Sequence, residues 1–408
     1  MHIDFAKLQY QYKLYKEEID QAIHAVLDKS NYIMGEEVYQ LEEGLCHFTG
    51  AKEAVTCASG TEALLLAMMA LDIQPGDEII TTPFTFIATA ETIALLGAKP
   101  VFVDIDEETY NIDPGKIEAA ITDKTKAIMP VSLYGQPADL TEIKSITDHY
   151  QLSLIVDGAQ SFGATYKDKA EVHWSDIYTT SFFPAKPLGC FGDGGAVLTN
   201  NPELAEKMRM LRVHGQNKRY HHKYIGLGGR MDTIQCAVVN VKLKYYAKDL
   251  KRRQEVAEKY SQLLVTAMND RYGVTVDSDR QEVTVNSDSD SMNNQNQKTV
   301  TDNCHLILPK VKSDRTSAFA QYSIRVQNRD DIQKKLSPST DTVTKIPTAV
   351  HYPMPLHLQE CFAYLGYKEG DFPIAEQVSN EIMSLPMNPY LTDEEIAYIA
   401  KKVIECLN

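Results

Sequence analysis

Short apolar runs alternate with stretches of helical periodicity between residues 51 and 245. The apolar runs are 53–59, 77–82, 99–105, 126–135 and 152–160, and the predicted helices are 61–71, 86–96, 115–121 and 139–150. Continuous apolar strands separated by helices are typical of a mostly parallel sheet that helices cover on both faces. Ligands of such sheets bind at the carboxyl ends of the strands, so chemistry is expected at that edge.

The pattern changes after about residue 245. The elements predicted beyond it are two strands and two helices, at 304–311, 320–328, 371–383 and 392–407. We therefore expect a large α/β domain at 1–245, with an N-terminal helical segment, and a smaller α+β domain at 246–408. Residues 276–303 are polar and poor in large apolar side chains, which indicates an exposed loop or hairpin within the smaller domain.

The chain has 408 residues, of which 43% are hydrophobic and 24% charged, an ordinary globular composition. A formal net charge of -15 argues against general nucleic-acid binding. No apolar run is long enough to cross a bilayer and the first residues contain no signal-peptide core, so we expect a cytoplasmic protein that is not inserted in a membrane. Its 7 cysteines show no CxxC spacing, which suggests neither a disulfide framework nor a zinc site.

One lysine stands in a setting that a surface lysine does not need. Lys186 lies between Pro184 and Pro187 in the stretch TTSFFPAKPLGCFGDGGAVLTN, residues 179–200, ahead of a cluster of glycines. A helix would not tolerate these prolines, and the pattern is that of a strand, a rigid loop and a returning strand. The sequence therefore predicts a lysine that its loop holds in place.

Other polar groups are predicted near the carboxyl ends of strands. Asp157 ends an apolar strand, where a carboxylate either caps a following helix or binds a metal. Gly60 and Thr61 follow Ser59 at the start of a predicted helix, whose free N–H groups form an anion site unless the hydroxyl is an ordinary cap. Ser181, ahead of the lysine, offers another hydroxyl to an anion.

Two aromatic residues, Phe84 and Phe86, follow another strand, where such residues either belong to the core or cover the face of a planar ring. A lysine, a carboxylate, an anion site and a stacking ring are the parts that a pyridoxal phosphate enzyme needs. The lysine forms the Schiff base, the carboxylate keeps the ring nitrogen protonated, and the displaced lysine amine moves the substrate proton. The sequence therefore indicates pyridoxal 5'-phosphate as the cofactor.

The chain resembles the DegT/DnrJ/EryC1/StrS family of nucleotide-sugar aminotransferases. The stretches that carry the resemblance are SGTEAL, PFTFIATAETIALLGAKPVFVDID, DGAQSFGATYKDK, TSFFPAKPLGCFGDGGAVLTN and PTAVHYPMPLH. Nearly the whole chain is covered, except about 276–312. The resemblance implies the type I aminotransferase fold, with a mostly parallel seven-stranded sheet in the large domain. It also implies a homodimer with active sites at the subunit interface, which converts a nucleotide-linked keto-sugar to an amino sugar, with L-glutamate as the amino donor.

The resemblance also implies roles for individual residues. Lys186 would be the Schiff-base lysine, and Asp157 would face the pyridine nitrogen. Gln160 would lie near the O3' atom of the ring, and Phe86 would stack on the ring. The residues implied to hold the phosphate are Gly60, Thr61 and Ser181. A branch of the family has His at the lysine position and dehydrates sugars, so the lysine of this chain favours transamination.

A basic and aromatic stretch at 209–232 suits a nucleotide diphosphate, because the rest of this chain is acidic. The alternative is a charged helix followed by a solvated loop. The paired residues His221 and His222 suggest a metal, but no cysteine or carboxylate spacing supports one, so no metal site is expected.

Within the family, the chain most resembles bacterial enzymes that aminate C3 of UDP-2-acetamido-2-deoxy-3-oxo-glucuronate. The stretches that carry this likeness are HGQ…RYHH, GLGGRMD and AVHYPMPLH. The product of those enzymes leads to surface polysaccharides, namely capsule and the O-antigen of lipopolysaccharide. By this resemblance Arg230, His351 and Tyr352 are candidates for holding the sugar and its carboxylate. The other candidate substrate-binding residues are His214, Arg219 and Tyr220. Relatives usually have Asn in place of Gly228, reaching the cofactor phosphate from the neighbouring subunit. That contact is therefore either lost here or made through water.

Two alternatives stay open at this point. An aminotransferase of a nucleotide-linked 4-keto-6-deoxy sugar belongs to the same family, but it would need no cation for a C6 carboxylate. A regulatory protein that keeps the fold and cofactor without turnover belongs to a different class, although it would have no need of both Lys186 and Asp157.

Overall fold

The computed structural model describes residues 2–272, 276–277, 282–283, 306–338 and 345–407. Its larger sheet has seven strands in the spatial order β1-β9-β8-β5-β4-β2-β3. These strands are β1 (Glu53–Cys57), β2 (Glu78–Thr81), β3 (Lys99–Phe102), β4 (Thr125–Ile128), β5 (Ser153–Asp157), β8 (Ile177–Ser181) and β9 (Gly195–Thr199). Every neighbouring pair is parallel except the two pairs that β9 makes, with β1 and β8. The predicted fold class, with a mostly parallel seven-stranded sheet, is confirmed.

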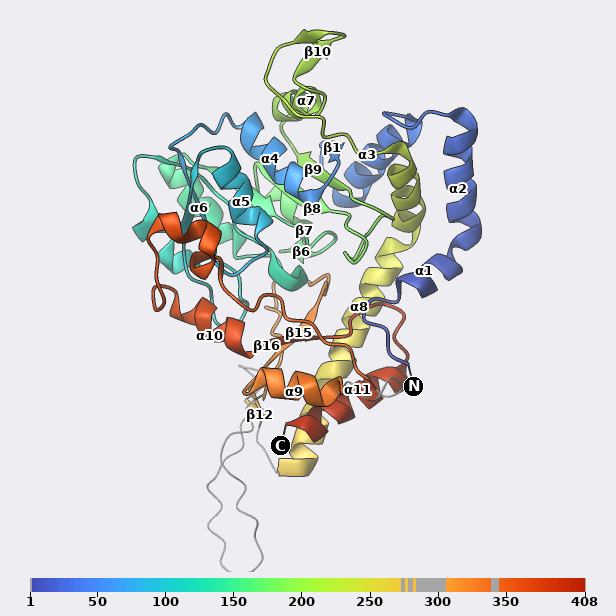
Figure 1. Ribbon diagram of the computed structural model, residues 1–408, viewed down its shortest axis with the longest axis vertical. Coiled ribbons are helices and arrows are strands. Elements are labelled where there is room, and N and C mark those ends of the chain that lie inside the picture. The colour runs from blue at the N-terminus through green and yellow to red at the C-terminus, as the bar shows by residue number, and fades with distance from the viewer. Residues whose placement is uncertain (1, 273–275, 278–281, 284–305, 339–344, 408) are drawn as a thin grey trace, which may run out of the picture.

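Helices cover both faces of this sheet (Figure 1). One core cluster packs α3 (Glu36–Thr49), α6 (Leu140–Tyr150) and α8 (Thr233–Tyr272) on one face. Another packs α4 (Gly60–Ala70), α5 (Ala88–Leu95) and α7 (Pro202–Leu211) on the other face. Alternate residues of one strand enter different clusters, as Val156 and Ile155 of β5 do, because successive side chains point to opposite faces. This is why the strands read as continuous apolar runs.

The helix predicted at 115–121 is wrong. The segment forms two short 3₁₀ turns, η1 (Pro114–Lys116) and η2 (Glu118–Ala120). The Asp113 side chain accepts a 2.9 Å hydrogen bond from the Gly115 amide, which caps the first turn. Gly115, near the start of the segment, has a low helix propensity, and the segment is short. It therefore forms 3₁₀ turns instead of an α-helix.

A second sheet is antiparallel throughout, in the order β12-β13-β14-β15-β16. Its strands are β12 (Val276–Asp277), β13 (Glu282–Val283), β14 (Leu306–Ile307), β15 (Tyr322–Val326) and β16 (Ile382–Leu385), and the helices beside it are α9 (Arg329–Leu336), α10 (Pro373–Glu381) and α11 (Asp393–Cys406). The helix predicted at 371–383 therefore ends early, because Ile382 already begins the buried strand β16. Most of the polar segment at 276–303 lies outside the described residues.

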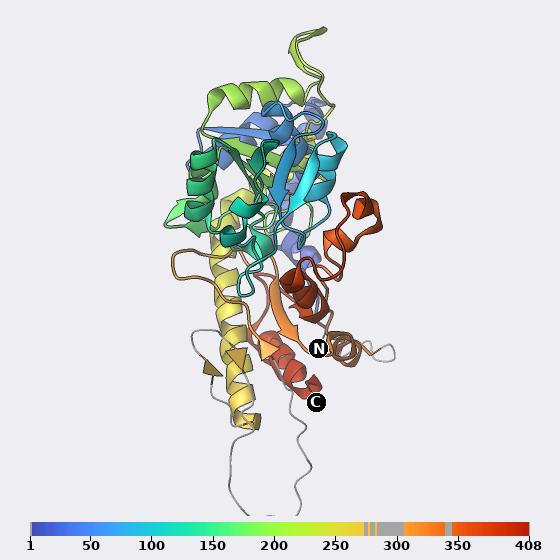
Figure 2. The ribbon, with the colours of Figure 1, turned by 90° about the vertical axis from the view of Figure 1, so that its left-hand side faces the viewer.

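One helix belongs to both parts of the molecule. Helix α8 is 40 residues long and runs through the domain boundary predicted at 245, as Figures 1 and 2 show. Its first half packs Val239 and Tyr246 into the core of the large sheet, whereas Tyr260 and Leu264 enter the core of the second sheet. Ile3, near the N-terminus, also packs in that second core. The division at 245 stays a prediction.

The remaining elements are short or peripheral. They are α1 (Leu8–Leu14), α2 (Lys16–Lys29), β6 (Thr165–Tyr166), β7 (Lys169–Ala170), β10 (Gln216–Lys218), β11 (His221–His222), η3 (Leu133–Gly135), η4 (Glu171–His173), η5 (Leu356–Leu358) and η6 (Glu360–Leu365). Strands β10 and β11 form a hairpin that projects beyond α7 (Figure 1). Among the helices of the described ranges, none has both the length and the apolarity that a membrane span requires.

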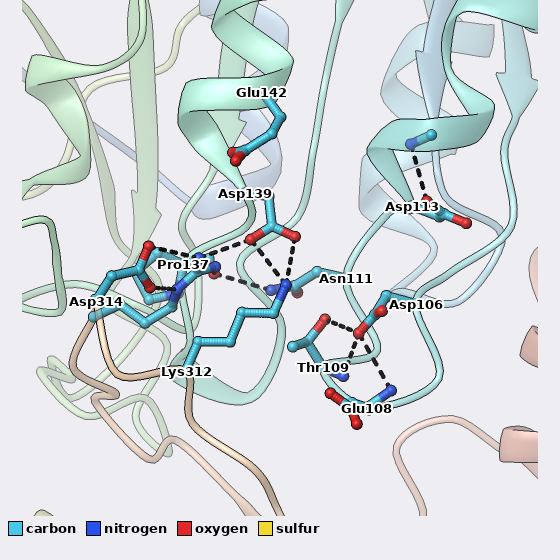
Figure 3. Close-up of polar contacts among 12 residues, drawn as sticks. Asp106, Glu108, Thr109, Asn111, Asp113, Pro137, Asp139, Glu142, Lys312 and Asp314 are labelled. Atoms are coloured by element: carbon cyan, nitrogen blue, oxygen red, sulfur yellow. Dashed lines mark hydrogen bonds and ion pairs between the residues drawn. The ribbon is translucent and has the colours of Figure 1, made fainter. Parts of the chain in front are cut away.

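An ionic network joins the start of α6 to the segment that leads into β15 (Figure 3). The Asp139 carboxylate accepts bonds of 2.8 Å from Lys312 Nζ and 2.7 Å from Arg315 Nη2. Arg315 also donates to the Asp314 carboxylate and to the Pro137 carbonyl. The Arg315 side chain is buried, and each of these donors has a partner. The network therefore holds the segment at residues 312–315 against the start of α6.

Candidate active site

Lys186 lies in the loop that joins β8 to β9, so the predicted sequence of strand, loop and returning strand is confirmed. The loop is closed by backbone hydrogen bonds, including one of 2.8 Å from the Lys186 amide to the Phe183 carbonyl. Its glycines serve close packing within the protein, since a Cβ on Gly195 would lie 2.5 Å from the Ser59 carbonyl oxygen and one on Gly189 would lie 2.5 Å from that of Pro184.

The environment of Lys186 favours its neutral amine. Burial lowers the pKa of Lys186 to about 8, and the negative charge of Asp157 opposes this shift. The two side chains therefore lie close enough to influence each other. A lysine whose amine is partly deprotonated near neutral pH is suited to nucleophilic and general-base chemistry.

Asp157 ends β5 and is 4% exposed. Its Oδ2 accepts a 2.8 Å hydrogen bond from Thr89 Oγ1, and its Oδ1 accepts one of 3.2 Å from the Ala159 amide. Burial raises the pKa of Asp157, while these two bonds and the charge of Lys186 counteract the rise. No helix follows Asp157, so it is not a helix cap. In the described part of the chain no group of three or more His, Cys, Asp or Glu residues is placed to hold a metal.

Gln160 and Tyr352 meet beside this pair. Gln160 Nε2 donates a 3.2 Å hydrogen bond to the Tyr352 hydroxyl, and Gln160 Oε1 accepts one of 2.8 Å from the Tyr134 amide. Burial and the charge of Asp157 raise the pKa of Tyr352, which keeps its hydroxyl protonated. The ring of Phe86 lies 6.0 Å from that of Tyr352 and is 53% exposed, so an aromatic face stands open to solvent at the edge of the site.

His351 reaches the same region from the segment before η5. Its Nδ1 lies 3.0 Å from Ser384 Oγ, and its carbonyl oxygen accepts a hydrogen bond from the Tyr134 hydroxyl. Burial, assisted by the positive charge of Lys186, lowers the pKa of His351 to about 4. The ring is therefore neutral at physiological pH.

The residues of the predicted anion site lie where α4 begins, beside the end of β8. A Cβ on Gly60 would lie 2.7 Å from the Ser181 Cβ, so only glycine allows this close approach. Thr61 occupies the first turn of α4. Ser59 Oγ accepts the Glu62 amide and caps the helix, so the cap and the anion site are compatible. The start of α4 and Ser181 therefore lie side by side.

The substrate candidates in the hairpin region do not join this group. Among the described residues, no contact links His214, Arg219, Tyr220 or Arg230 to Lys186 or Asp157. Tyr220 is 78% exposed on the projecting hairpin, and Arg219 stacks on its ring at 5.3 Å. His214 lies against Gly228, where an added Cβ would be 3.1 Å from the His214 ring. An Asn at 228 would therefore crowd the His214 ring, which would have to shift slightly.

Two residues that support the site were not predicted from the sequence. Thr89 donates to Asp157 from α5, and Lys242 of α8 donates a 2.6 Å hydrogen bond to the Gly189 carbonyl of the lysine-bearing loop. Thr89 lies in the stretch TFIATAET, within the helix predicted at 86–96. A polar residue at a core position of that helix could have indicated its role. Lys242 gave none, because lysines on helices are ordinarily exposed.

Comparison with known proteins decides the family. A model of the DegT/DnrJ/EryC1/StrS aminotransferase family matches residues 13–299 and 294–404. The chain belongs to this family. It is 43% identical to UDP-2-acetamido-2-deoxy-3-oxo-D-glucuronate aminotransferase of Pseudomonas aeruginosa, over 97% of this chain and 98% of the relative. It is also 40% identical to a pleiotropic regulatory protein of Geobacillus stearothermophilus, over 99% and 98%.

A solved structure shows how this fold carries a cofactor. The protein NtdA of Bacillus subtilis, crystallised with its cofactor PMP bound, matches with a TM-score of 0.84 and 27% identity, over 100% of this chain and 85% of that one. Together with family membership, this makes pyridoxal phosphate the cofactor of this aminotransferase. The residues present fit that group, because they offer a desolvated lysine, a buried carboxylate, a glycine-lined helix start and an open aromatic face.

Proposed function

We propose that this chain transfers the amino group of L-glutamate to C3 of UDP-2-acetamido-2-deoxy-3-oxo-D-glucuronate, releasing the 3-amino sugar and 2-oxoglutarate. The observation that carries the proposal is the 43% identity, along nearly the full length, to a relative named for that sugar. The reaction would take place in the cytoplasm. Its product would contribute to the biosynthesis of O-antigen, which is part of lipopolysaccharide, or of capsule.

The placement of the residues supports a role for each of them in this proposal. Pyridoxal phosphate, when bound, supplies an aldehyde that accepts the amino group and a ring that withdraws electrons from the carbon beside it. Lys186 would hold the cofactor through its Nζ, and its free amine would move the proton at the substrate carbon, for which its depressed pKa is suited. Asp157 would keep the pyridine nitrogen protonated, because a buried carboxylate that accepts two hydrogen bonds remains an anion beside a cation.

Five further residues complete the cofactor site in this proposal. Phe86 would cover one face of the ring with its exposed aromatic side chain, and Gln160 would offer a hydrogen-bonding group beside the ring. Gly60, Thr61 and Ser181 would hold the phosphate, because the start of α4 lies beside Ser181.

The substrate site requires a second copy of the chain. Arg219 and Tyr220 lie on the hairpin of β10 and β11, which projects beyond α7 (Figure 1), and His214 precedes that hairpin. Ile225 is 91% exposed beside it, an apolar surface that a second subunit would cover. In a homodimer with shared active sites, Arg230 and this hairpin would reach the neighbouring subunit, where His351 and Tyr352 hold the sugar. Arg230 would then bind the C6 carboxylate in bidentate fashion.

A panel of keto-sugars tests the proposal. Purified protein is incubated with glutamate and either the UDP-3-oxo-uronate or a 4-keto-6-deoxy sugar nucleotide, and 2-oxoglutarate is measured. Turnover with the uronate is expected. If only the 4-keto-6-deoxy sugar were aminated, the uronate assignment would be rejected. The assignment to the aminotransferase family would still hold. Arg230→Gln should raise the KM for the uronate at least tenfold, while a 4-keto-6-deoxy sugar, which lacks the carboxylate, should be unaffected.

Shared active sites are tested by mixing inactive variants. Lys186→Ala and Arg230→Gln subunits, each weak or inactive alone, should regain activity when unfolded together and refolded as mixed dimers. Activity that stays at the level of the separate variants would reject the shared site. A regulatory role, which the name of the Geobacillus relative raises, predicts bound cofactor without turnover. Glutamate should instead bleach the yellow colour of the purified protein.

A further inference from the structure

Glu171 is a buried carboxyl group for which the proposed reaction has no use. It lies in η4 and is 2% exposed. One carboxyl oxygen accepts a hydrogen bond from the Ser132 hydroxyl, and the other accepts one of 2.5 Å from the Ser161 hydroxyl. Both oxygens are therefore engaged by seryl groups from two other segments of the chain.

These two serines stand on either side of Asp157. Ser132 follows β4, and its amide donates a 3.0 Å hydrogen bond to the Asp157 carbonyl. Ser161 follows Gln160 directly, and its amide donates to the Gly158 carbonyl at 3.1 Å. The Tyr178 hydroxyl donates to that same carbonyl at 3.2 Å and lies 3.4 Å from Ser161 Oγ. The Glu171 carboxyl thus ties the end of β4 to the turn at residues 157–161.

The charges around Glu171 do not explain its presence as a stabilising ion pair. Burial raises the pKa of Glu171 to about 7, and the charge of Asp157 raises it as well. The two serine hydroxyls and the charge of Arg315 lower it, but no ion pair within 4 Å joins Arg315 to Glu171. Among the described residues, Tyr178 also interacts electrostatically with this carboxyl. A buried acid without a close cation is costly for folding, so an apolar residue would serve a purely structural purpose better.

We propose that Glu171 is a positioning residue that holds the Asp157–Gln160 turn against the end of β4, and thereby fixes Asp157 and Gln160 relative to the cofactor. The clamp itself is a property of the protein without cofactor, whereas its importance for turnover rests on the proposed function. Glu171 does not touch the reacting atoms. It acts through Ser161 and Ser132, whose hydroxyls can both donate only while an acceptor lies between them.

The test compares Glu171→Leu, which removes both acceptors, with Glu171→Gln, which keeps one. Glu78→Leu is the matched control, because Glu78 is 7% exposed, accepts from the Thr122 hydroxyl and starts β2 at the opposite end of the sheet. Amide hydrogen exchange at residues 157–161 is measured in cofactor-free protein, and kcat and KM are measured in the loaded enzyme. Glu171→Leu should speed exchange at this turn at least tenfold and lower kcat at least tenfold, with KM within about threefold of wild type. Glu171→Gln should lie between, and Glu78→Leu should change neither quantity.

Each outcome decides the proposal. Wild-type exchange at 157–161 in Glu171→Leu overturns the clamp, whatever the enzyme acts on. Faster exchange with an unchanged kcat overturns its role in turnover. If wild-type protein aminates no keto-sugar, the proposed function fails, while the exchange experiment still tests the clamp by itself. Should Glu171→Leu not fold, Ser161→Ala removes one donor and should speed exchange at the same turn, and wild-type exchange in that variant overturns the clamp.

Discussion

Thr89 Oγ1 donates a 2.8 Å hydrogen bond to Asp157 Oδ2, although 68 residues separate the two side chains in sequence. Thr89 is fully buried in α5, and the bond runs from the helix layer to the carboxyl end of the central strand β5. Since burial alone raises the pKa of Asp157, this hydroxyl is one of the groups that keep the carboxylate ionised.

Thr89→Val should therefore weaken the enzyme without changing the shape of the side chain. We expect loss of about 1.5–3 kcal/mol of stabilisation of the ionised carboxylate, the value of a hydrogen bond to a charged group, and a roughly tenfold drop in kcat. Thr92→Val is the matched control, because Thr92 is buried in the same helix and donates to the Ala88 carbonyl at 2.8 Å. Equal kcat values for the two variants would contradict the role assigned to Thr89. Steady-state kinetics with glutamate as donor provide the measurement.

The sheet and the centre of the site could be predicted because both follow from local pattern. Apolar runs separated by helices specify a parallel sheet, and such a sheet brings the carboxyl ends of its strands together. Asp157 at the end of β5 and Lys186 after the neighbouring strand β8 therefore had to lie near each other. Their proximity needed no knowledge of tertiary packing beyond this rule.

The parts that could not be predicted depend on contacts between distant segments. Glu171 sits in the polar stretch KDKAEVHWSD, which reads as exposed, and only the fold buries it between two serines. Helix α8 was not predicted at all, because its apolar residues face one core in its first half and another in its second. A helix whose buried face changes along its length has no single apolar stripe to recognise.

Because the pKa of Lys186 is lowered on folding, the stability of the cofactor-free protein should change with pH in the alkaline range. Below pH 8 the folded state carries a desolvated ammonium. The fall of the Lys186 pKa from 10.5 to about 8 corresponds to a cost of about 3 kcal/mol. Between these values the folded protein has released the proton and the unfolded chain still binds it, so stability rises with pH. Lys186→Met should be more stable than wild type at pH 7, and the gap should narrow by pH 10. Urea unfolding measures this, and a gap independent of pH would contradict it.

Lys242 should affect activity through the loop that it anchors. Its ammonium donates to the Gly189 carbonyl and lies 4.5 Å from the centre of the Phe191 ring. Lys242→Met leaves that carbonyl unpaired, so we expect faster hydrogen exchange at residues 188–191 and a several-fold lower kcat. Lys244→Met is the control, because Lys244 lies on the same helix but is exposed and paired with Glu18. If the two variants behave alike in both measurements, Lys242 does not support the loop.

Because the pKa of His351 is lowered on folding, the protein should become less stable at acid pH. Its pKa falls from 6.5 to about 4 on folding, so the unfolded chain binds one more proton than the folded protein between these values. Stability should therefore decline as pH falls through this window, by up to about 3 kcal/mol at pH 4. His351→Asn, which keeps a polar group beside Ser384, should lose less stability between pH 7 and pH 4.5 than wild type. His221→Asn, on the exposed hairpin, is the control and should follow the wild-type curve.

The same protonation state bears on how the sugar would be held. A neutral imidazole can offer a carboxylate one N–H donor but no charge, so the cation would have to come from Arg230. Raising the pH from 6 to 7.5 should then leave the KM for the uronate within about twofold, because His351 is neutral throughout. A KM that rises steeply over this range in wild type, and not in His351→Asn, would show that His351 binds the substrate as a cation.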